Sequence, residues 1–100
     1  MMGKGVAQYK LTAVVQATEA LVGVPGQRLM GVSLKGGSGT STAEFYNHLT
    51  AATGTAVFVV TTIAYDNKFI DLSEYGGILC ATGIWCKVTG TAAIAYCWVG

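Results

Sequence analysis

Charged residues are scarce in this 100-residue chain. Only 11% of its residues are charged and 52% are hydrophobic, whereas an average soluble domain carries about 25% charged residues. The net charge is +1 and no basic run is present, so we expect no nucleic-acid partner. The chain has too few charged side chains for the surface of a fully solvated monomer. Either the chain lies in a membrane or other subunits cover part of its surface.

A long helical apolar run is also missing. A membrane-spanning helix needs about 20 consecutive, predominantly apolar residues. The longest stretch without Asp, Glu, Lys or Arg, residues 45–65, contains Asn, His, Gly and five Thr. That composition is typical of strands and turns. We therefore expect no membrane partner, and we see no secretory signal at the N-terminus.

Histidine and cysteine are too few for most catalytic or metal sites. His48 is the single histidine, and the three cysteines are Cys80, Cys86 and Cys97. Together they are the most obvious zinc ligand set, but they lack a CxxC spacing, so we expect no metal. We interpret the cysteines as small buried hydrophobes of a protein made in a reducing cytoplasm. A Cys86–Cys97 bridge across a hairpin is the alternative. His48 fits a hydrogen-bonded or exposed residue at a strand end.

Motifs for catalysis or cofactor binding are absent as well. The Gly-Gly-Ser-Gly stretch at 36–39 has neither the GxSxG spacing nor the Lys-Ser/Thr of a phosphate loop, which favours a flexible hairpin loop. Asp71 and Glu74 are a close acidic pair, as glycosidases require, but a turn-borne pair is expected to be solvated. We expect no catalytic residue, no cofactor and no enzyme activity.

What the chain does contain is alternation of apolar and polar residues with a period of two, which is typical of half-buried strands. One face of the first run holds Ala7, Tyr9, Leu11, Ala13 and Val15, and Val14 is the one apolar residue on the other face. Further strands are predicted at 28–35, 40–47, 55–63 and 68–72. In the second of these, Ala43 and Phe45 lie opposite Glu44 and Tyr46. The third is apolar on both faces, which suits a central strand.

The last third of the chain contains three apolar runs at 78–81, 84–89 and 91–99, separated by Gly-containing turns. This pattern predicts a meander. In the last run Ile94, Tyr96 and Trp98 share one face and neither face is polar, so this strand is either central or buried against a neighbouring chain. Helical spacing occurs only at 18–22, which is too short for a helix.

These patterns predict an all-β fold, a single small β-sandwich or barrel of about eight short antiparallel strands. Residues 1–5 are expected to form a flexible N-terminal arm, and residues 6–100 a single β domain. Most of the aromatic side chains should lie in the core. Four of them at outward positions are candidate interface residues, because Tyr and Trp are enriched at interfaces: Tyr46, Trp85, Tyr96 and Trp98.

From Leu29 onward the chain contains a series of short motifs in a distinctive order. A Gly-Val pair at 31–32 precedes a Gly/Ser/Thr loop and a strand with aromatic residues and Asn at 43–47. A Thr-Gly-Thr turn at 53–55 and a Val/Phe strand follow. The chain then has Thr-Gly-Ile at 82–84 and Val-Thr-Gly-Thr at 88–91. The separate motifs are turn chemistry, but in this order the chain resembles small β-sandwich virion structural proteins of tailed phages.

The resemblance implies a capsid decoration (cement) protein. Such a protein would form a homotrimer, bind the major capsid protein on the capsid surface of the virion, and assemble in the host cytoplasm. A tail or fibre-associated component is the first alternative. A carbohydrate-binding module, using outward aromatic side chains and loop Asn or Asp, is an alternative of another class.

Overall fold

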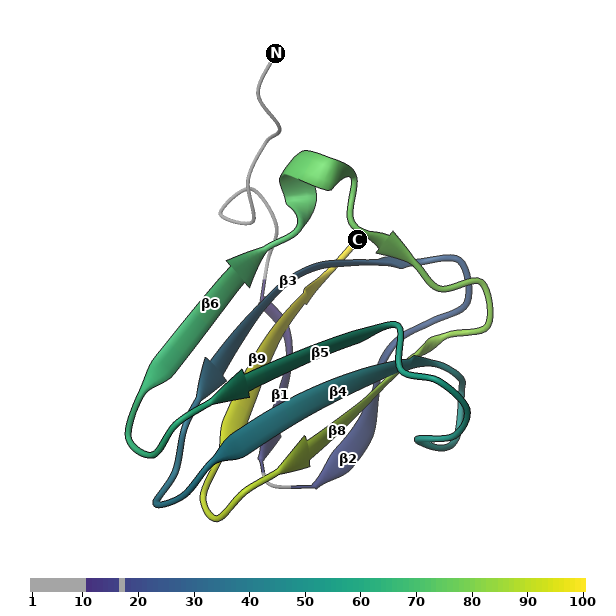
Figure 1. The fold of residues 1–100 in the computed structure, drawn as a ribbon. Helices are drawn as coiled ribbons and strands as arrows, with labels where there is room; N and C mark the ends of the chain where they lie inside the picture. The colour runs from purple at the N-terminus through teal and green to yellow at the C-terminus, as the bar shows by residue number, and fades with distance from the viewer. Residues whose placement is uncertain (1–10, 17) are drawn as a thin grey trace.

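Two antiparallel sheets packed face to face form the fold of the described residues, 11–16 and 18–100, in a computed structural model (Figure 1). The predicted arm at 1–5 and the predicted start of the first strand at 7–10 lie outside these residues. Nine strands are present in the described part of the chain. The all-β prediction is confirmed, and of the two predicted architectures the sandwich is the one observed, since the sheets do not close into a barrel.

Sheet A contains five strands and sheet B four. Sheet A has the order β1 (Leu11–Gln16), β9 (Ile94–Val99), β3 (Arg28–Lys35) and β6 (Asn67–Asp71), with β7 (Ile78–Leu79) also paired to β3. Sheet B has the order β2 (Glu19–Gly23), β8 (Ile84–Thr89), β4 (Ser41–Asn47) and β5 (Phe58–Thr62). β9 is therefore central, one of the two predicted alternatives. β5 is an edge strand, so the prediction of a central strand there is wrong.

Most connections in the chain pass from one sheet to the other. Among the described strands, β4 and β5 are the one consecutive pair that is hydrogen-bonded. The predicted meander is wrong, because β8 and β9 lie in different sheets and β7 pairs with β3. Gly-containing turns reverse the chain in hairpins and in sheet-to-sheet arches alike, so turn chemistry does not reveal the pairing partner.

The segment that showed only short helical spacing is a strand, β2, at one edge of sheet B. A 3₁₀ turn at Ser73–Tyr75 follows β6. Within residues 11–16 and 18–100, no helix has the length and apolar character needed to cross a membrane.

A β-bulge changes which side chains of β1 face the core. The register against β9 shifts between Leu11 and Ala13, and a bulge adds one residue to a strand. Leu11 is consequently 47% exposed, while Val15 is buried. The prediction that Leu11 shares the face of Val15 is wrong for this reason.

The core lies between the sheets and is almost entirely apolar. Alternate residues of each strand point into it, as the sandwich requires, and a fully buried Leu, Ile or Phe side chain stabilises the fold by about 1.5–3 kcal/mol. In the described residues no buried side-chain oxygen or nitrogen lacks a hydrogen-bond partner. The largest fully buried side chains are Phe45, Leu29, Leu34, Ile84 and Val32.

Two arches meet at one end of the sandwich. The loop at 36–39 joins β3 of sheet A to β4 of sheet B, so it is not the hairpin loop predicted. Its Ser38 N–H donates to the carbonyl oxygen of Thr91 (3.3 Å), in the turn between β8 and β9, and its Gly37 N–H donates to Ser41 Oγ (3.2 Å). A Cβ on Gly37 would lie 1.6 Å from the Thr91 oxygen, so only glycine fits there.

Gly37→Ala is expected to destabilise the protein by about 3 kcal/mol, because the two arches must separate to admit the methyl group. Gly39→Ala in the same loop is the matched control: its Cβ would have no heavy atom within 4 Å, and the expected change is about 0.5 kcal/mol or less. Urea unfolding followed by Trp fluorescence measures both. Equal midpoints for the two variants would contradict the assigned role of Gly37.

Candidate interaction surfaces

The four candidate interface residues lie on two opposite outer faces of the sandwich. Tyr96 and Trp98 lie on β9 in sheet A, and Tyr46 and Trp85 are directly paired on β4 and β8 in sheet B. Trp85, Tyr96 and Trp98 are half-buried, and Tyr46 is 9% exposed. The four residues therefore do not form one surface.

The outer face of sheet A, here called the apolar face, is mostly uncharged. Its three cross-strand rows follow from the pairing of β1, β9, β3 and β6. They are Leu11, Trp98, Gly31 and Asp71; Val14, Tyr96, Ser33 and Phe69; and Gln16, Ile94, Lys35 and Asn67. The middle row carries no charge. Asp71 in the first row and Lys35 in the third are the single charges of those rows, and they lie at opposite ends of the strands. An exposed apolar surface of this kind is typical of an interaction site.

Two aromatic rings meet above β3 on the apolar face. Phe69 of β6 and Trp98 of β9 contact edge to face, with ring centroids 5.8 Å apart and planes at 81°, a favoured geometry for aromatic pairs. β3 lies between these two strands and contributes only Gly31 and Ser33 beneath the rings. Because these side chains are small, the rings can reach each other across the strand.

Sequence reasoning missed three exposed apolar residues of this surface. The exposure of Leu11 follows from the bulge in β1. Phe69 is 51% exposed, but alternation in a short strand does not reveal which face is inward. Val14, 46% exposed, did have a signal, since it is the one apolar residue on the otherwise polar side of its strand.

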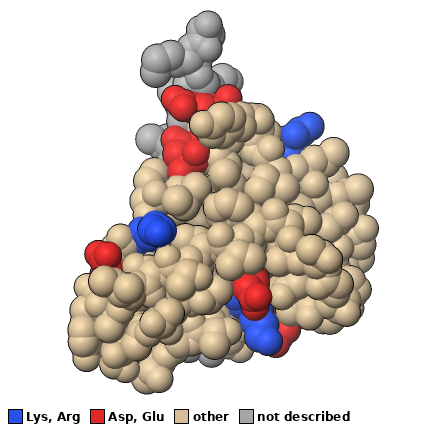
Figure 2. Space-filling model, in the orientation of Figure 1, with Lys and Arg blue, Asp and Glu red and all other residues tan. Residues whose placement is uncertain are grey.

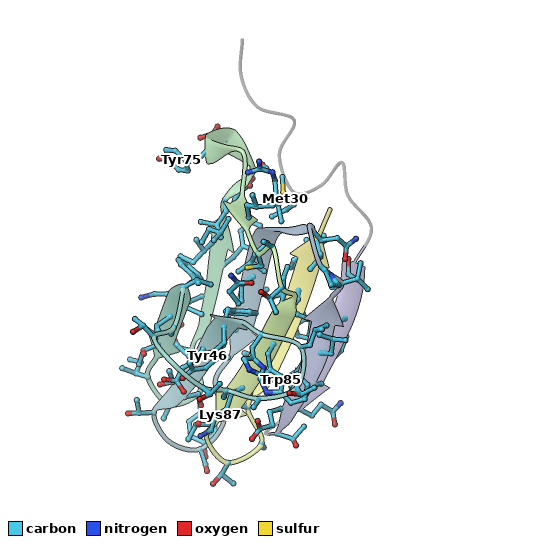
Figure 3. The ribbon with its side chains drawn as sticks, turned by 90° about the vertical axis from the view of Figure 1, so that its right-hand side faces the viewer. Met30, Tyr46, Tyr75, Trp85 and Lys87 are labelled. Carbon is cyan, nitrogen blue, oxygen red and sulfur yellow. The ribbon has the colours of Figure 1, made fainter. Side chains whose placement is uncertain are left out.

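On the outer face of sheet B, here called the polar face, the aromatic residues interact with carboxylates. Trp85 Nε1 donates to Glu19 Oε1 (2.8 Å), and the Glu44 carboxylate is close enough to Tyr46 to raise the pKa of its hydroxyl. In Figure 3, Tyr46, Trp85 and Lys87 lie near one another over β4 and β8. Tyr46 and Trp85 are thus already engaged within the chain, which makes them weaker interface candidates than Tyr96 and Trp98.

Charges of alternating sign cross the polar face. Glu19 pairs with Lys87, and Lys87 pairs with Glu44, at directly opposed positions on three neighbouring strands. Opposite charges at such positions stabilise a sheet by about 0.2–1 kcal/mol. Figure 2 shows acidic and basic side chains gathered over β4 and β8, with much of the remaining surface uncharged. This face therefore differs in character from the apolar face.

Burial raises the pKa of Tyr46 above its ordinary value, and the neighbouring Glu44 carboxylate raises it further. A raised pKa means that folding favours the neutral phenol. This contribution to stability is complete below the ordinary tyrosine pKa of about 10 and is lost as the pH rises through the raised value.

An alkaline titration of tyrosinate absorbance is expected to show a step above the ordinary tyrosine pKa that Tyr46→Phe removes. Tyr75→Phe, at a position 83% exposed, is the control and should keep that step. The unfolding free energy of the wild type should fall more steeply above about pH 10 than that of Tyr46→Phe. Identical titrations of wild type and Tyr46→Phe would refute the assignment.

The other residues singled out by the sequence have structural partners. His48 Nδ1 accepts the backbone N–H groups of Thr50 and Ala51 (both 3.1 Å), which confirms the hydrogen-bonded histidine at a strand end. Asp71 Oδ1 accepts the Ser73 N–H (2.9 Å) at the 3₁₀ turn, so this carboxylate of the acidic pair is not merely solvated.

The three cysteines, Cys80, Cys86 and Cys97, are free and buried, as predicted. The described residues contain no pocket and no cluster of three or more His, Cys, Asp or Glu side chains that could hold a metal ion.

The fold and its surfaces define a small antiparallel β-sandwich with one apolar and one polar outer face. No protein-family model matches the chain, and no curated protein matches it significantly. The resemblance to tailed-phage virion proteins rests on the order of its motifs and stays a prediction.

Proposed function

We propose that the protein is a capsid decoration protein that binds the head shell of a tailed phage. The apolar face is the observation that carries this proposal. Leu11, Val14 and Phe69 are each about half exposed there, at 47, 46 and 51%, in a chain with only 11% charged residues. A protein that exposes an apolar sheet face to water tends to associate through that face. Binding to a capsid shell would cover it. The motif order of residues 29–100 supports the same class.

The size of the apolar face favours a repetitive shell over a single tight partner. Four strands about 4.8 Å apart, each about 6 residues long at about 3.3 Å per residue, span about 400 Å². A standard stable interface removes about 800 Å² from each partner. One such face binds weakly by itself, but a homotrimer that presents three of them to adjacent capsid subunits gains affinity through multivalency.

The ratio of this protein to the major capsid protein in purified particles tests the proposed location. We expect a ratio near one to one, measured by quantitative mass spectrometry with isotope-labelled reference peptides. A much smaller ratio would move the protein to the tail or a vertex and refute the decoration role. Absence from particles would remove the virion proposal and favour the carbohydrate-binding alternative.

Two lysine substitutions, one on each outer face, test which face binds the shell. Val14→Lys places a charge on the apolar face, and Val59→Lys places one on the polar face. Both are edge-strand valines of similar exposure, 46 and 49%. We expect Val14→Lys to weaken binding to heads lacking the protein by at least about tenfold, since desolvating an unpaired charge costs well over 1.4 kcal/mol, and Val59→Lys to bind as the wild type does.

Co-sedimentation with such heads measures this binding, and circular dichroism verifies that both variants are folded. Equal weakening by both substitutions, or by neither, would refute the assignment of the apolar face to the shell.

A further inference from the structure

Cys86 and Cys97 lie at equal distances in sequence from the turn at 90–93, on two strands that belong to opposite sheets. β8 lies in sheet B and β9 in sheet A, and the turn between them is closed by the Ala93 N–H donating to the Gly90 oxygen (3.3 Å). Cys86 precedes Gly90 by four residues and Cys97 follows Ala93 by four. The arch therefore brings these two positions opposite each other, not side by side in a hairpin.

Both side chains point inward, one from each sheet. Cys86 and Cys97 are each 0% exposed and belong to one core cluster. Interaction with Cys97 is the first cause of the raised pKa of the Cys86 thiol, as expected of two thiols that are neighbours across the core.

Small side chains surround the pair on its edge side. Ala20 of β2 is the cross-strand neighbour of Cys86, and Ala13 of β1 is the neighbour of Cys97. β1 and β2 contact each other at this edge. Packed sheets are ordinarily about 10 Å apart, which is too far for a disulfide. At this edge the sheets come closer, since Cα atoms of β1 lie within 8 Å of Cα atoms of β8, and those of β2 within 8 Å of those of β9.

We propose that Cys86 and Cys97 are a disulfide site that links the two sheets when the protein passes from reducing to oxidising surroundings. Cys80, although also buried, takes no part. This inference concerns the chain by itself and does not depend on the proposed function.

The oxidant can be a small disulfide such as oxidised glutathione. A thiolate of one cysteine attacks a glutathione sulfur, the glutathione S–S bond breaks, and one reduced glutathione leaves. The second cysteine, as thiolate, then attacks the protein sulfur of this mixed disulfide and expels the second glutathione. The protein loses two hydrogens, and one oxidised glutathione becomes two reduced molecules.

Oxidation of the folded protein should be slow. Interaction with Cys97 and burial in the core raise the pKa of the Cys86 thiol, and the thiolate is the species that attacks a disulfide. Moderate urea, which increases opening of the core, should therefore accelerate the reaction.

The experiment incubates the reduced full chain with oxidised glutathione, with and without moderate urea, and then alkylates it in denaturant. We expect an intact mass lower by two hydrogens and one alkylated cysteine. Trypsin cleaves after Lys87, which separates Cys97 from Cys86 and Cys80, so the disulfide should join residues 69–87 to residues 88–100. Fragmentation of this linked species should find the alkyl group on Cys80.

Three variants complete the test. Cys80→Ala should form the disulfide as the wild type does, whereas Cys86→Ala and Cys97→Ala should not. The oxidised wild type and oxidised Cys80→Ala should melt about 10 °C above their reduced forms, because the bridge closes a loop of the unfolded chain.

Alkylation of all three cysteines after incubation in urea would overturn the proposal, as would a bridge containing Cys80 or a link between two chains. If the alanine variants do not fold, the alkylation pattern and linked peptides of the wild type decide by themselves.

Discussion

The close packing of two arches at one end of the sandwich is the constraint on which the arrangement of the strands depends. Each arch carries the chain from one sheet to the other, and the backbone of Gly37 lies against the Thr91 carbonyl with no room for a side chain. Since the first arch joins β3 to β4 and the second joins β8 to β9, their contact fixes the central strands of both sheets relative to each other.

The second arch also places β8 and β9 on opposite sides of the core. Cys86 and Val88 of β8 and Ala95 and Cys97 of β9 are all buried in one core cluster. A hairpin would place the same residues side by side in one sheet. The difference matters chemically, because a bond between Cys86 and Cys97 links two sheets and not two neighbouring strands.

Much of the local structure could be predicted from the sequence, and the pairing of strands could not. Alternation located β3 at Arg28–Lys35 and β8 at Ile84–Thr89 with the observed bounds, and it assigned Phe45 and Tyr46 to opposite faces. It failed for Leu11, because a bulge shifts the register without an obvious sequence signal. The predicted pairing of the final three strands was wrong, since Thr-Gly turns occur in both hairpins and arches.

The candidate surfaces show the same limit. Tyr96 and Trp98 were recognisable because their strand is apolar on both faces. Their neighbour Phe69 comes from a strand distant in sequence, and only the order β9-β3-β6 brings its ring to Trp98. Without that order, Tyr46 and Trp85 are indistinguishable as candidates from Tyr96 and Trp98, although they lie on the opposite face.

The contrast between the two faces gives the sandwich a preferred orientation against any surface that it covers. Covering the polar face would remove Glu19, Lys87 and Glu44 from water, and the cost of desolvating these neighbouring charges is at best offset by their mutual attraction. Covering the apolar face would bury the half-exposed side chains of Leu11, Val14 and Phe69, which is favourable at about 25 cal/mol per Å². A partner that contacts this domain through a sheet face therefore meets sheet A, with the charge row of sheet B turned to solvent.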